Sequence, residues 1–429
     1  MKKIILLFFI FTNSIFAQNF QITEVGNLPV KVANNAVCEG FINGNPYLFS
    51  FGGIDSTKIY SGIHLKSYRY NIQTGTVLQT PDLPDSQGKI AAAASRIDSV
   101  IYIIGGYHVS ANGSEVSSNK IHRYNINTNA FLTDGTDIPI AIDDHVQAVW
   151  KDSLIYIITG WSNNGNVPNV QLYNPFLDSW TAASPTPNNN NYKSFGASGT
   201  IIGDTIYYFG GASMVGAFNV QNQLRKGVIN PNNPTDISWS FEIPESQIKG
   251  YRMACTRVNN QIHWIGGSGI TYNFNGIAYN GSGGVPTINR DLYFDFQTSS
   301  WLTNSAIIPM DLRGIANVND SVKYIAGGMI LNQEVTNKIY KLEWSNTITS
   351  IKESENDYTI FPNPSNGNFQ IKASSNLKNI TILNTLGGEV FSAKNISEKN
   401  INIDVRFLSK GTYIIKLNEL KITEKLLIY

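Results

Sequence analysis

The segment Ile101-Tyr102-Ile103-Ile104-Gly105-Gly106 decides the fold, because close copies of it recur along the chain. In each copy a short run of aliphatic and aromatic residues ends in two small residues. The copies lie at 47–53, 101–106, 155–160, 206–211, 262–267 and 322–328. The first small residues of successive copies are 51 to 61 positions apart. Recurrence at such a period is typical of architectures in which repeated units stack on one another.

The residues around each copy complete a four-stranded unit. An apolar segment and a turn precede the copy, and a third segment follows with an aromatic residue and, seven positions later, a large apolar residue. Four repeats keep this spacing: Tyr70 and Val77, Tyr124 and Phe131, Tyr173 and Trp180, Phe294 and Trp301. The small pair is Gly-Gly except where Thr159 replaces the first glycine. Glycine adopts conformations that are closed to residues with a Cβ, so the pair marks a strand end where neighbouring units approach closely.

Together these features resemble the Kelch repeat, whose units of about 50 residues form the blades of a β-propeller. The resemblance implies an all-β fold, a six-bladed Kelch-type propeller over residues 18–344. The sixth repeat has a third strand at 337–343 but no evident fourth strand, whereas 20–27 has the pattern of a fourth strand. We therefore expect residues 20–27 to complete blade 6 and close the ring, which removes open sheet edges.

The first 17 residues have the pattern of a signal peptide. Lys2 and Lys3 precede an apolar run over 4–11 that is too short to span a membrane, and Ala17 supplies a small residue before a cleavage site. A retained membrane anchor is the alternative interpretation. No later stretch approaches the ~20 apolar residues of a membrane helix, so we expect no integral membrane segment in the mature chain.

A second set of motifs lies at the C-terminus, after a polar linker at 345–357. The motifs are Tyr358-Thr359-Ile360-Phe361-Pro362-Asn363-Pro364, residues 380–390, Leu408-Ser409-Lys410-Gly411-Thr412-Tyr413 and Lys425-Leu426-Leu427-Ile428-Tyr429. They resemble the type A C-terminal sorting domain of the type IX (Por) secretion system. The resemblance implies that 358–429 is a small β-sandwich, that the type IX secretion machinery is a partner, and that the protein is secreted or displayed on the outer-membrane surface after crossing the periplasm. By strand periodicity alone, a carbohydrate-binding β-sandwich is the alternative.

Charge and composition exclude several classes of function. The net charge of +1 combines +2 at 1–17, +4 at 358–429 and −5 over the 21 basic and 26 acidic residues of 18–357. The central region therefore has no excess of positive charge for nucleic acid. The two cysteines, Cys38 and Cys255, are expected to be reduced and buried, and the five histidines show no metal-ligand spacing. We expect neither a metal nor another cofactor.

Candidate binding residues fall on the rim that carries the loops entering each inner strand and the loops after each glycine pair. Fourteen positions before each first small residue, we expect equivalent places for Cys38, Ala91, His145, Gly196, Arg252 and Arg313. The two guanidinium groups, with Asp143, Asp144 and Asp311 in the entering loops, could hold an anion at the mouth of the ring. Tyr107 and Trp161 could stack on a sugar, and the loop 268–290 is expected to overhang this rim. The alternative is structural: arginines that tie blades together and aromatic rings that only pack.

The predicted function is that of a binding module for a glycan or a protein ligand, with catalytic residues unassigned. The alternative is a carbohydrate-active enzyme of the sialic acid mutarotase (epimerase) type. The motif of that family has a Glu directly after the glycine pair of a central blade and an Arg shortly after it. In this sequence Ala212 follows Gly210-Gly211 and the first arginine is Arg225, so an acid would have to come from Asp144, Asp311 or Glu245.

Overall fold

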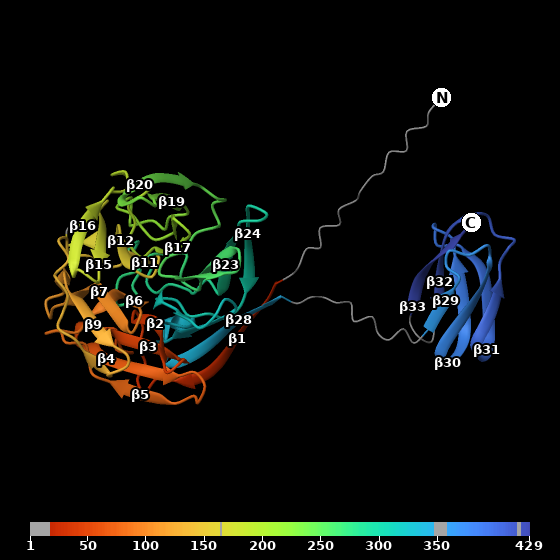
Figure 1. Ribbon diagram of the computed structural model, residues 1–429, viewed down its shortest axis with the longest axis horizontal. Coiled ribbons are helices and arrows are strands. Elements are labelled where there is room, and N and C mark those ends of the chain that lie inside the picture. Colours follow the sequence, from red (N-terminus) through yellow and green to blue (C-terminus); the bar gives the residue numbers. More distant parts are fainter. Residues whose placement is uncertain (1–17, 164, 347–357, 418–421) are drawn as a thin grey trace, which may run out of the picture. The chain divides into compact units, whose positions relative to one another are not determined.

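A computed structural model describes residues 18–163, 165–346, 358–417 and 422–429. They belong to two compact units, Gln18–Asn346 and a C-terminal unit from Thr347 onward. Figure 1 shows the first unit as a ring of small sheets and the second as a group of strands. The predicted signal peptide at 1–17 lies outside the described residues, as do positions 347–357 of the predicted linker.

The first unit is a six-bladed β-propeller, and five blades follow chain order from the inside outward. Blade 1 contains β2 (Ala36–Ile42), β3 (Asn45–Ile54), β4 (Ile63–Asn71) and β5 (Val77–Thr80). Blade 2 contains β6 (Ile90–Ile97), β7 (Val100–Val109), β9 (Ile121–Asn125) and β10 (Ala130–Phe131), with β8 (Glu115–Ser117) beside β7. Blade 3 contains β11 (Val146–Trp150), β12 (Leu154–Ile158), β15 (Val170–Asn174) and β16 (Ser179–Ala183).

Blades 4 and 5 repeat the pattern with longer loops. Blade 4 contains β17 (Ser198–Ile202), β18 (Thr205–Phe209), β19 (Leu224–Asn230) and β20 (Asn233–Glu242). Blade 5 contains β21 (Ala254–Val258), β22 (Gln261–Ile265), β23 (Arg290–Asp295) and β24 (Ser300–Ser305). The remaining short elements lie at strand ends and in loops: β13 (Trp161–Ser162), β14 (Gly165–Asn166), β25 (Arg313–Gly314) and the 3₁₀ turns η1 (Tyr60–Gly62) and η2 (Leu331–Gln333).

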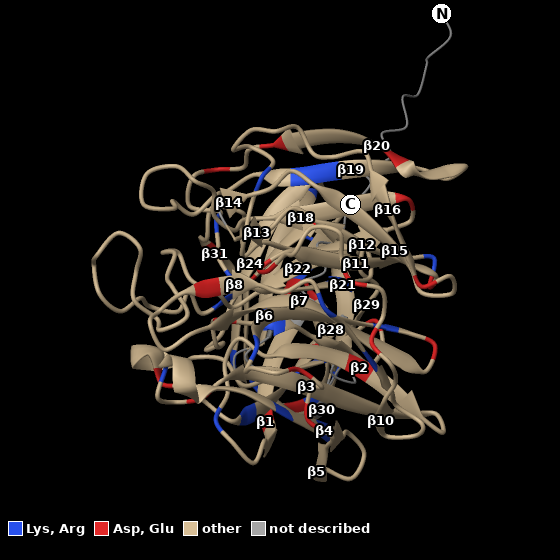
Figure 2. Ribbon diagram, turned by 90° about the vertical axis from the view of Figure 1, so that its left-hand side faces the viewer, with Lys and Arg blue, Asp and Glu red and all other residues tan. Residues whose placement is uncertain are grey.

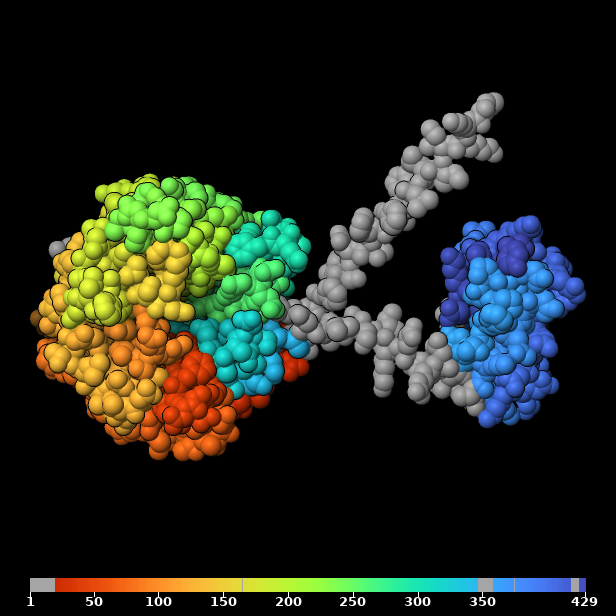
Figure 3. Space-filling model, viewed as in Figure 1, coloured from red at the N-terminus to blue at the C-terminus, as the bar shows by residue number. Residues whose placement is uncertain are grey.

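Blade 6 joins the two ends of the propeller. Its strands are β26 (Ala316–Asn317), β27 (Val322–Ala326), β28 (Lys338–Asn346) and β1 (Gln18–Asn27). The outermost strand β1 pairs with β28 in an antiparallel register that runs from Gln18 opposite Asn346 to Asn27 opposite Lys338. The prediction that the N-terminal strand completes blade 6 is therefore confirmed. Figure 3 shows the chain proceeding sector by sector around the ring until its first and last parts meet.

The glycine pair allows close contact between neighbouring blades, as Gly105-Gly106 illustrates. Gly105 has φ +65°, and a Cβ on it would lie 2.3 Å from the carbonyl oxygen of Ile142, which leads into blade 3. The N–H group of Gly106 donates a hydrogen bond to the same oxygen at 3.0 Å. Thr159 breaks the pattern, and its hydroxyl group accepts a hydrogen bond from the N–H group of Ser194, ahead of blade 4, at 3.0 Å.

The propeller core consists of apolar layers between neighbouring blades. Ile104, Ile157 and Tyr173 pack in the cluster between blades 2 and 3, and Ile158, Ile206 and Tyr208 pack in the cluster between blades 3 and 4. Each sheet is therefore covered on both faces, and a single blade cannot bury its side chains alone. Figure 2 shows that acidic and basic residues instead occur mainly in loops and at strand ends.

The C-terminal unit has five strands around a core of its own. They are β29 (Tyr358–Phe361), β30 (Asn368–Leu383), β31 (Glu389–Asp404), β32 (Gly411–Leu417) and β33 (Ile422–Ile428). The long strand β30 pairs with β31 along both halves, with β29 near its start and with β32 near its end. The strand-rich fold agrees with the small sandwich predicted from the tail motifs.

The structure also bears on membrane-spanning helices, metal-binding groups and the two cysteines. Among the described residues, no helix is long and apolar enough to cross a membrane, and no group of His, Cys, Asp and Glu has a metal-binding arrangement. Cys38 and Cys255 are free thiols on inner strands of blades 1 and 5. Cys38 is buried as predicted, whereas Cys255 is only partly buried, and burial raises the pKa of both thiols.

Candidate functional site

A ring of six backbone positions surrounds the axis where the chain enters the inner strands. All six residues have positive φ angles between 45° and 66°: Asn34, Ala91, Asp144, Gly196, Arg252 and Asp311. Hydrogen bonds between their peptide groups link consecutive blades, for example from the Arg252 N–H group to the Gly196 oxygen at 2.8 Å. The residue before each one pairs with the residue that follows a small pair, as Asp143 does with Trp161. The entering loops and the loops after the glycine pairs therefore share one rim, as predicted.

The predicted alignment of this ring was wrong in three blades. His145, Arg313 and Cys38 lie one, two and four residues beyond the ring position, in blades 3, 6 and 1, while Arg252 occupies it. The backbone bridges set the equivalence, and the number of residues between a bridge and the next glycine pair differs among blades. Counting back a fixed distance from the glycine therefore misplaces the side chains.

Arg252 is fully buried in an ionic cluster that joins the ring positions of blades 3, 5 and 6. Its Nη2 and Nε atoms donate to the two carboxylate oxygens of Asp144 at 2.6 and 3.2 Å, and its Nη1 donates to Asp311 Oδ1 at 3.1 Å. The guanidinium also lies 5.1 Å from the Tyr251 ring centre and 5.3 Å from that of Tyr272. The pKa of Arg252 is raised well above its usual value by the charge of Asp144, against a desolvation effect in the opposite direction. Arg252 is therefore already engaged by carboxylates of its own chain.

Arg313 and His145 lie one layer further in, facing the axial channel. Arg313 Nη2 donates to the His145 carbonyl oxygen at 2.9 Å, and its Nη1 is 3.5 Å from Asp144 Oδ1. Burial lowers the pKa of His145 to about 3, so the imidazole is neutral at physiological pH. Both residues line a channel of about 260 Å³ formed by the inner strands of all six blades. The two arginines therefore do not face one another across an open mouth.

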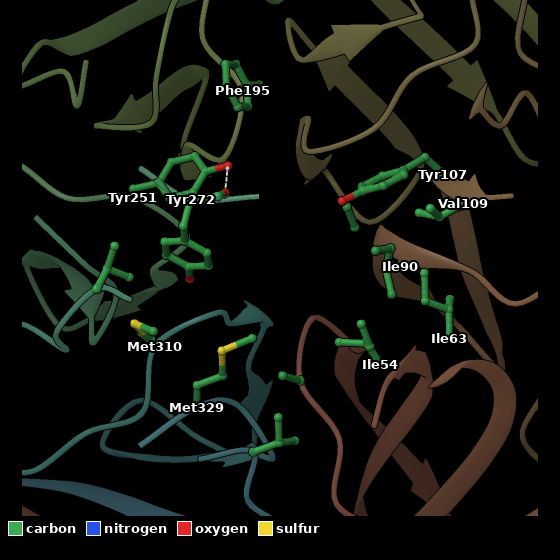
Figure 4. Packing of buried hydrophobic residues seen from close by; sticks show 14 of the residues in the cluster. Ile54, Ile63, Ile90, Tyr107, Val109, Phe195, Tyr251, Tyr272, Met310 and Met329 are labelled. Atoms are coloured by element: carbon green, nitrogen blue, oxygen red, sulfur yellow. Dashed lines mark hydrogen bonds between the residues drawn. The ribbon is translucent and has the colours of Figure 1, made fainter. Parts of the chain in front are cut away.

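An apolar layer covers the ring on the rim side. Figure 4 shows side chains from several blades in this layer, among them Tyr107, Tyr251 and Met329, with the hydrogen bond from the Tyr251 hydroxyl to the Tyr272 carbonyl oxygen. The loop 268–290 contributes Tyr272, whose hydroxyl group donates to Asp311 Oδ1 at 3.3 Å. Thr271 in the same loop donates to the Phe218 carbonyl oxygen of blade 4 at 2.6 Å. The predicted overhang of this loop is confirmed.

A pocket opens in this layer between blades 2, 3, 4 and 5; we call it the rim pocket. Its volume is about 110 Å³, and its lining residues are Tyr107, Glu115, Asp143, Asp144, Trp161, Phe195, Phe218, Arg252, Asn273 and Tyr279. Trp161, Phe218 and Tyr279 are only partly buried. The ring centres of Trp161 and Phe218 are 5.7 Å apart, and those of Phe218 and Tyr279 are 4.9 Å apart. The pocket therefore has a continuous aromatic wall.

Two carboxyl groups give this pocket its polarity. Asp143 is 4% exposed, and its Oδ2 accepts a hydrogen bond from the Ser117 hydroxyl at 2.6 Å. Burial raises the pKa of Asp143 well above its usual value, and the neighbouring charge of Asp144 adds to the effect. Burial also raises the pKa of Glu115, which lies at the start of β8, the red part of that strand in Figure 2.

The structure brings together only part of the predicted site. Tyr107, Trp161, Asp144 and Arg252 line the rim pocket, whereas Arg313 and His145 line the channel, and Asp311 is buried beneath Tyr272. The sequence interpretation named Asp143 in the entering loop but not as a binding residue, and it missed Glu115, Phe218 and Tyr279. These three come from the loops after the glycine pairs of blades 2, 4 and 5, whose unusual length was the available signal.

The comparisons with known proteins agree with both units. A family model for a secretion system C-terminal sorting domain matches residues 359–429. Kelch-like protein 36 of Bos taurus is 26% identical over 39% of this chain and 25% of its own length. Beta-scruin of Limulus polyphemus is 24% identical over 61% of this chain and 27% of its own length. The chain is a Kelch propeller with a C-terminal sorting domain.

A solved structure titled "Structure of YjhT" has the same propeller fold. It superposes with a TM-score of 0.59 and 16% sequence identity, over 73% of this chain and 96% of that one. The matched part of the chain spans about a quarter of the length of the curated Kelch-like protein 36 and Beta-scruin. The sorting domain directs the protein through type IX secretion to the cell surface or the extracellular space.

Proposed function

We propose that the Kelch propeller is a secreted carbohydrate-binding module whose ligand occupies the rim pocket. The aromatic wall next to two carboxyl groups is the observation that carries the proposal. A sugar presents an apolar C–H face and a rim of hydroxyl groups, which suits flat rings such as Trp161 on one side and acceptors such as Glu115 on the other. The loops that supply these residues are held by the blades, so the pocket is preformed.

A protein ligand is the second candidate, because exposed apolar side chains lie on the same rim as the pocket. They lie on the rim loops of four blades: Val116 (50% exposed), Met214 (52%), Val215 (45%), Ile277 (54%) and Leu331 (73%). Clustered exposed apolar residues are more typical of a protein contact than of a sugar site.

The carbohydrate-active enzyme remains an alternative that needs a different acid from the family motif. Arg225 is fully buried and donates to the carbonyl oxygens of Asn191 and Gly210, so it does not face the rim pocket. Asp144 and Asp311 are bound to Arg252, and Glu245 is exposed and not among the lining residues. Asp143 and Glu115 are the acids that the pocket itself offers.

A glycan array on the purified protein tests the carbohydrate proposal. We expect binding that Trp161→Ala reduces at least about tenfold, since stacking and burial of such a ring contribute roughly 1–3 kcal/mol. Phe176→Ala is the matched control, because Phe176 is 94% exposed on the turn between β15 and β16 at the opposite rim. Equal loss in both variants, or no bound glycan, would contradict the proposal.

Anomer-exchange NMR with the bound sugar separates a binding module from an epimerase. We expect no acceleration of exchange. Accelerated exchange that Asp143→Asn abolishes would replace the binding module by the enzyme. If no glycan binds and the propeller captures a protein only while Val116 and Ile277 are intact, the protein ligand takes its place.

A further inference from the structure

The rim pocket has more acidic than basic side chains. Three carboxyl groups line it, Glu115, Asp143 and Asp144, against the single guanidinium group of Arg252. Arg252 forms its ion pairs with Asp144 and Asp311, which it reaches through all three of its nitrogens. Among the residues that the structure describes, no lysine, arginine or histidine forms an ion pair with Glu115 or Asp143. The pocket therefore has two carboxyl groups in excess.

Asp143 is held in place rather than free to turn toward solvent. Ser117 donates its hydroxyl hydrogen to Asp143 and accepts a hydrogen bond from the Asn163 N–H group at 2.9 Å. The Asn163 side chain in turn accepts from the Ser117 N–H group at 3.0 Å. These bonds join the loops of blades 2 and 3, so the carboxyl group is fixed, and Asp143 is only 4% exposed.

The aromatic wall stands beside these carboxyl groups and not on a separate face. Trp161 directly faces the segment of Asp143, because the two residues form a backbone bridge with N–H to oxygen distances of 2.9 Å in both directions. Phe218 and Tyr279 continue the wall toward Asn273. Rings of this kind attract cations through their electron-rich faces, and the attraction grows when the cation is desolvated.

We propose that the rim pocket recognises the protonated amino group of an amino sugar. This inference rests on the proposed carbohydrate function and specifies the class of sugar. The ammonium group donates hydrogen bonds to Asp143 and Glu115, while the sugar ring lies against Trp161. A neutral sugar leaves the two carboxyl groups without a countercharge, and an acidic sugar adds to the excess.

The burial of Asp143 makes its ionisation depend on the ammonium group of the ligand. The groups that act on Asp143 are Asp144 and Glu115, which favour its neutral form, and Ser117 and Arg252, which favour its ionised form, with burial as the dominant effect. The result is a pKa raised well above the usual value, so acid keeps this carboxyl group neutral. A bound ammonium group favours the carboxylate, and binding is therefore expected to weaken as the pH is lowered.

Calorimetry on the full-length protein with three matched sugars tests this inference. The probes are β-1,4-linked tetramers of glucosamine, N-acetylglucosamine and glucose, which differ only at the 2-position. We expect the glucosamine tetramer to bind at least about tenfold more tightly than the other two, as a charge-assisted hydrogen bond contributes roughly 1.5–3 kcal/mol. Asp143→Asn and Glu115→Gln should each reduce this preference while binding of the glucose tetramer is kept.

The control variant is Glu245→Gln, an exposed carboxyl group that does not line the pocket, and it should change nothing. If all three tetramers bind equally, the amino-sugar inference is wrong while the carbohydrate proposal stands. If none binds, but tetramethylammonium chloride does and Asp143→Asn prevents it, the pocket is a cation site and both statements fail. Thermal melting of each variant shows whether it folds, and Glu115→Gln, at the exposed start of β8, keeps the test open if Asp143→Asn does not fold.

Discussion

At the residue scale, Arg252 has a structural task that its sequence context did not reveal. It lies in blade 5 yet binds Asp144, 108 positions earlier, and Asp311, 59 positions later. A buried guanidinium group with two carboxylates loses its hydration, so the pairs fix geometry more than they add stability. Of the two interpretations of Arg252, blade tying agrees with these contacts, and anion capture does not. The groups that remain without an ion-pair partner at the pocket are the carboxyl groups of Asp143 and Glu115, among the residues that the structure describes.

Substitution of Arg252 should destabilise the propeller, because Asp144 and Asp311 would stay buried without a countercharge. We expect Arg252→Met to lower the free energy of unfolding by about 3–5 kcal/mol, because Asp144 and Asp311 lose their countercharge. Arg257→Met is the control, since Arg257 is exposed and its Nε donates a hydrogen bond to the Asn259 carbonyl oxygen, away from the cluster. Urea unfolding followed by tryptophan fluorescence measures both variants. A change below about 1 kcal/mol for Arg252→Met would contradict the role of the cluster.

His145 should make the propeller sensitive to acid. Its pKa is lowered to about 3 by burial and by the charge of Arg313, from 6.5 for an unperturbed histidine. Between these values the unfolded chain binds a proton that the folded chain does not, so stability from this group is complete above pH 6.5 and is lost as the pH falls. We expect a slope of about 1.4 kcal/mol per pH unit from this residue. In His145→Gln, unfolding midpoints at pH 7 and pH 5 should differ less than in the unaltered protein; an unchanged difference would contradict this assignment.

At the element scale, the glycine pair and the ring of positive φ angles are two parts of one connection between blades. The second strand of a blade ends in the pair, and a carbonyl oxygen from the next blade fills the space where a side chain would begin. Peptide hydrogen bonds then run from blade to blade around the axis. The glycines therefore recur for a reason of packing, and their positions could be predicted because five of the six blades use the same contact, with Thr159 as the exception.

Comparing Gly105→Ala with Gly203→Ala separates the effect of that contact from the effect of backbone strain. We expect a loss clearly larger than that of Gly203→Ala, although both glycines have positive φ, +65° and +58°. A Cβ at Gly203 meets nothing within 4 Å, so that variant has only the strain of about 1–2 kcal/mol. A Cβ at Gly105 also collides with the Ile142 carbonyl oxygen and shifts blade 3. Similar melting temperatures for the two variants would show that the close approach is unimportant.

At the scale of the whole molecule, the chain divides into a propeller, which contains the rim pocket, and a C-terminal sorting domain, which directs secretion. The sequence charge of −5 over 18–357 and +4 over 358–429 follows the same division. Each unit has its own apolar core, which includes Phe369, Ile380 and Ile415 in the C-terminal unit and Ile206 and Tyr208 in the propeller. The two units can therefore be altered separately.

Deletion of 358–429 should separate delivery from binding. Because the family model covers 359–429, we expect the truncated protein to stay in the periplasm. Its propeller should keep the melting temperature and the ligand affinity of the full chain, since β1 and β28 close the ring without the tail. Cell fractionation with immunodetection, followed by calorimetry on the recovered protein, measures the two properties. Unchanged surface delivery of the truncated form would refute this prediction.

The sequence by itself determined the propeller, the number of blades, the closing strand and the sorting tail. Each of these depends on contacts that repeat, such as an apolar strand followed by Gly105-Gly106, so a pattern in the chain carries them. The tertiary structure alone decided the site. The loops that meet at Asp143, Phe218 and Tyr279 differ in length and follow no repeat, and the ion pairs of Arg252 join residues far apart in the sequence. The distances between side chains on different blades decide which carboxyl groups in the rim pocket lack an ion-pair partner. Those distances are defined only once the ring of blades is closed.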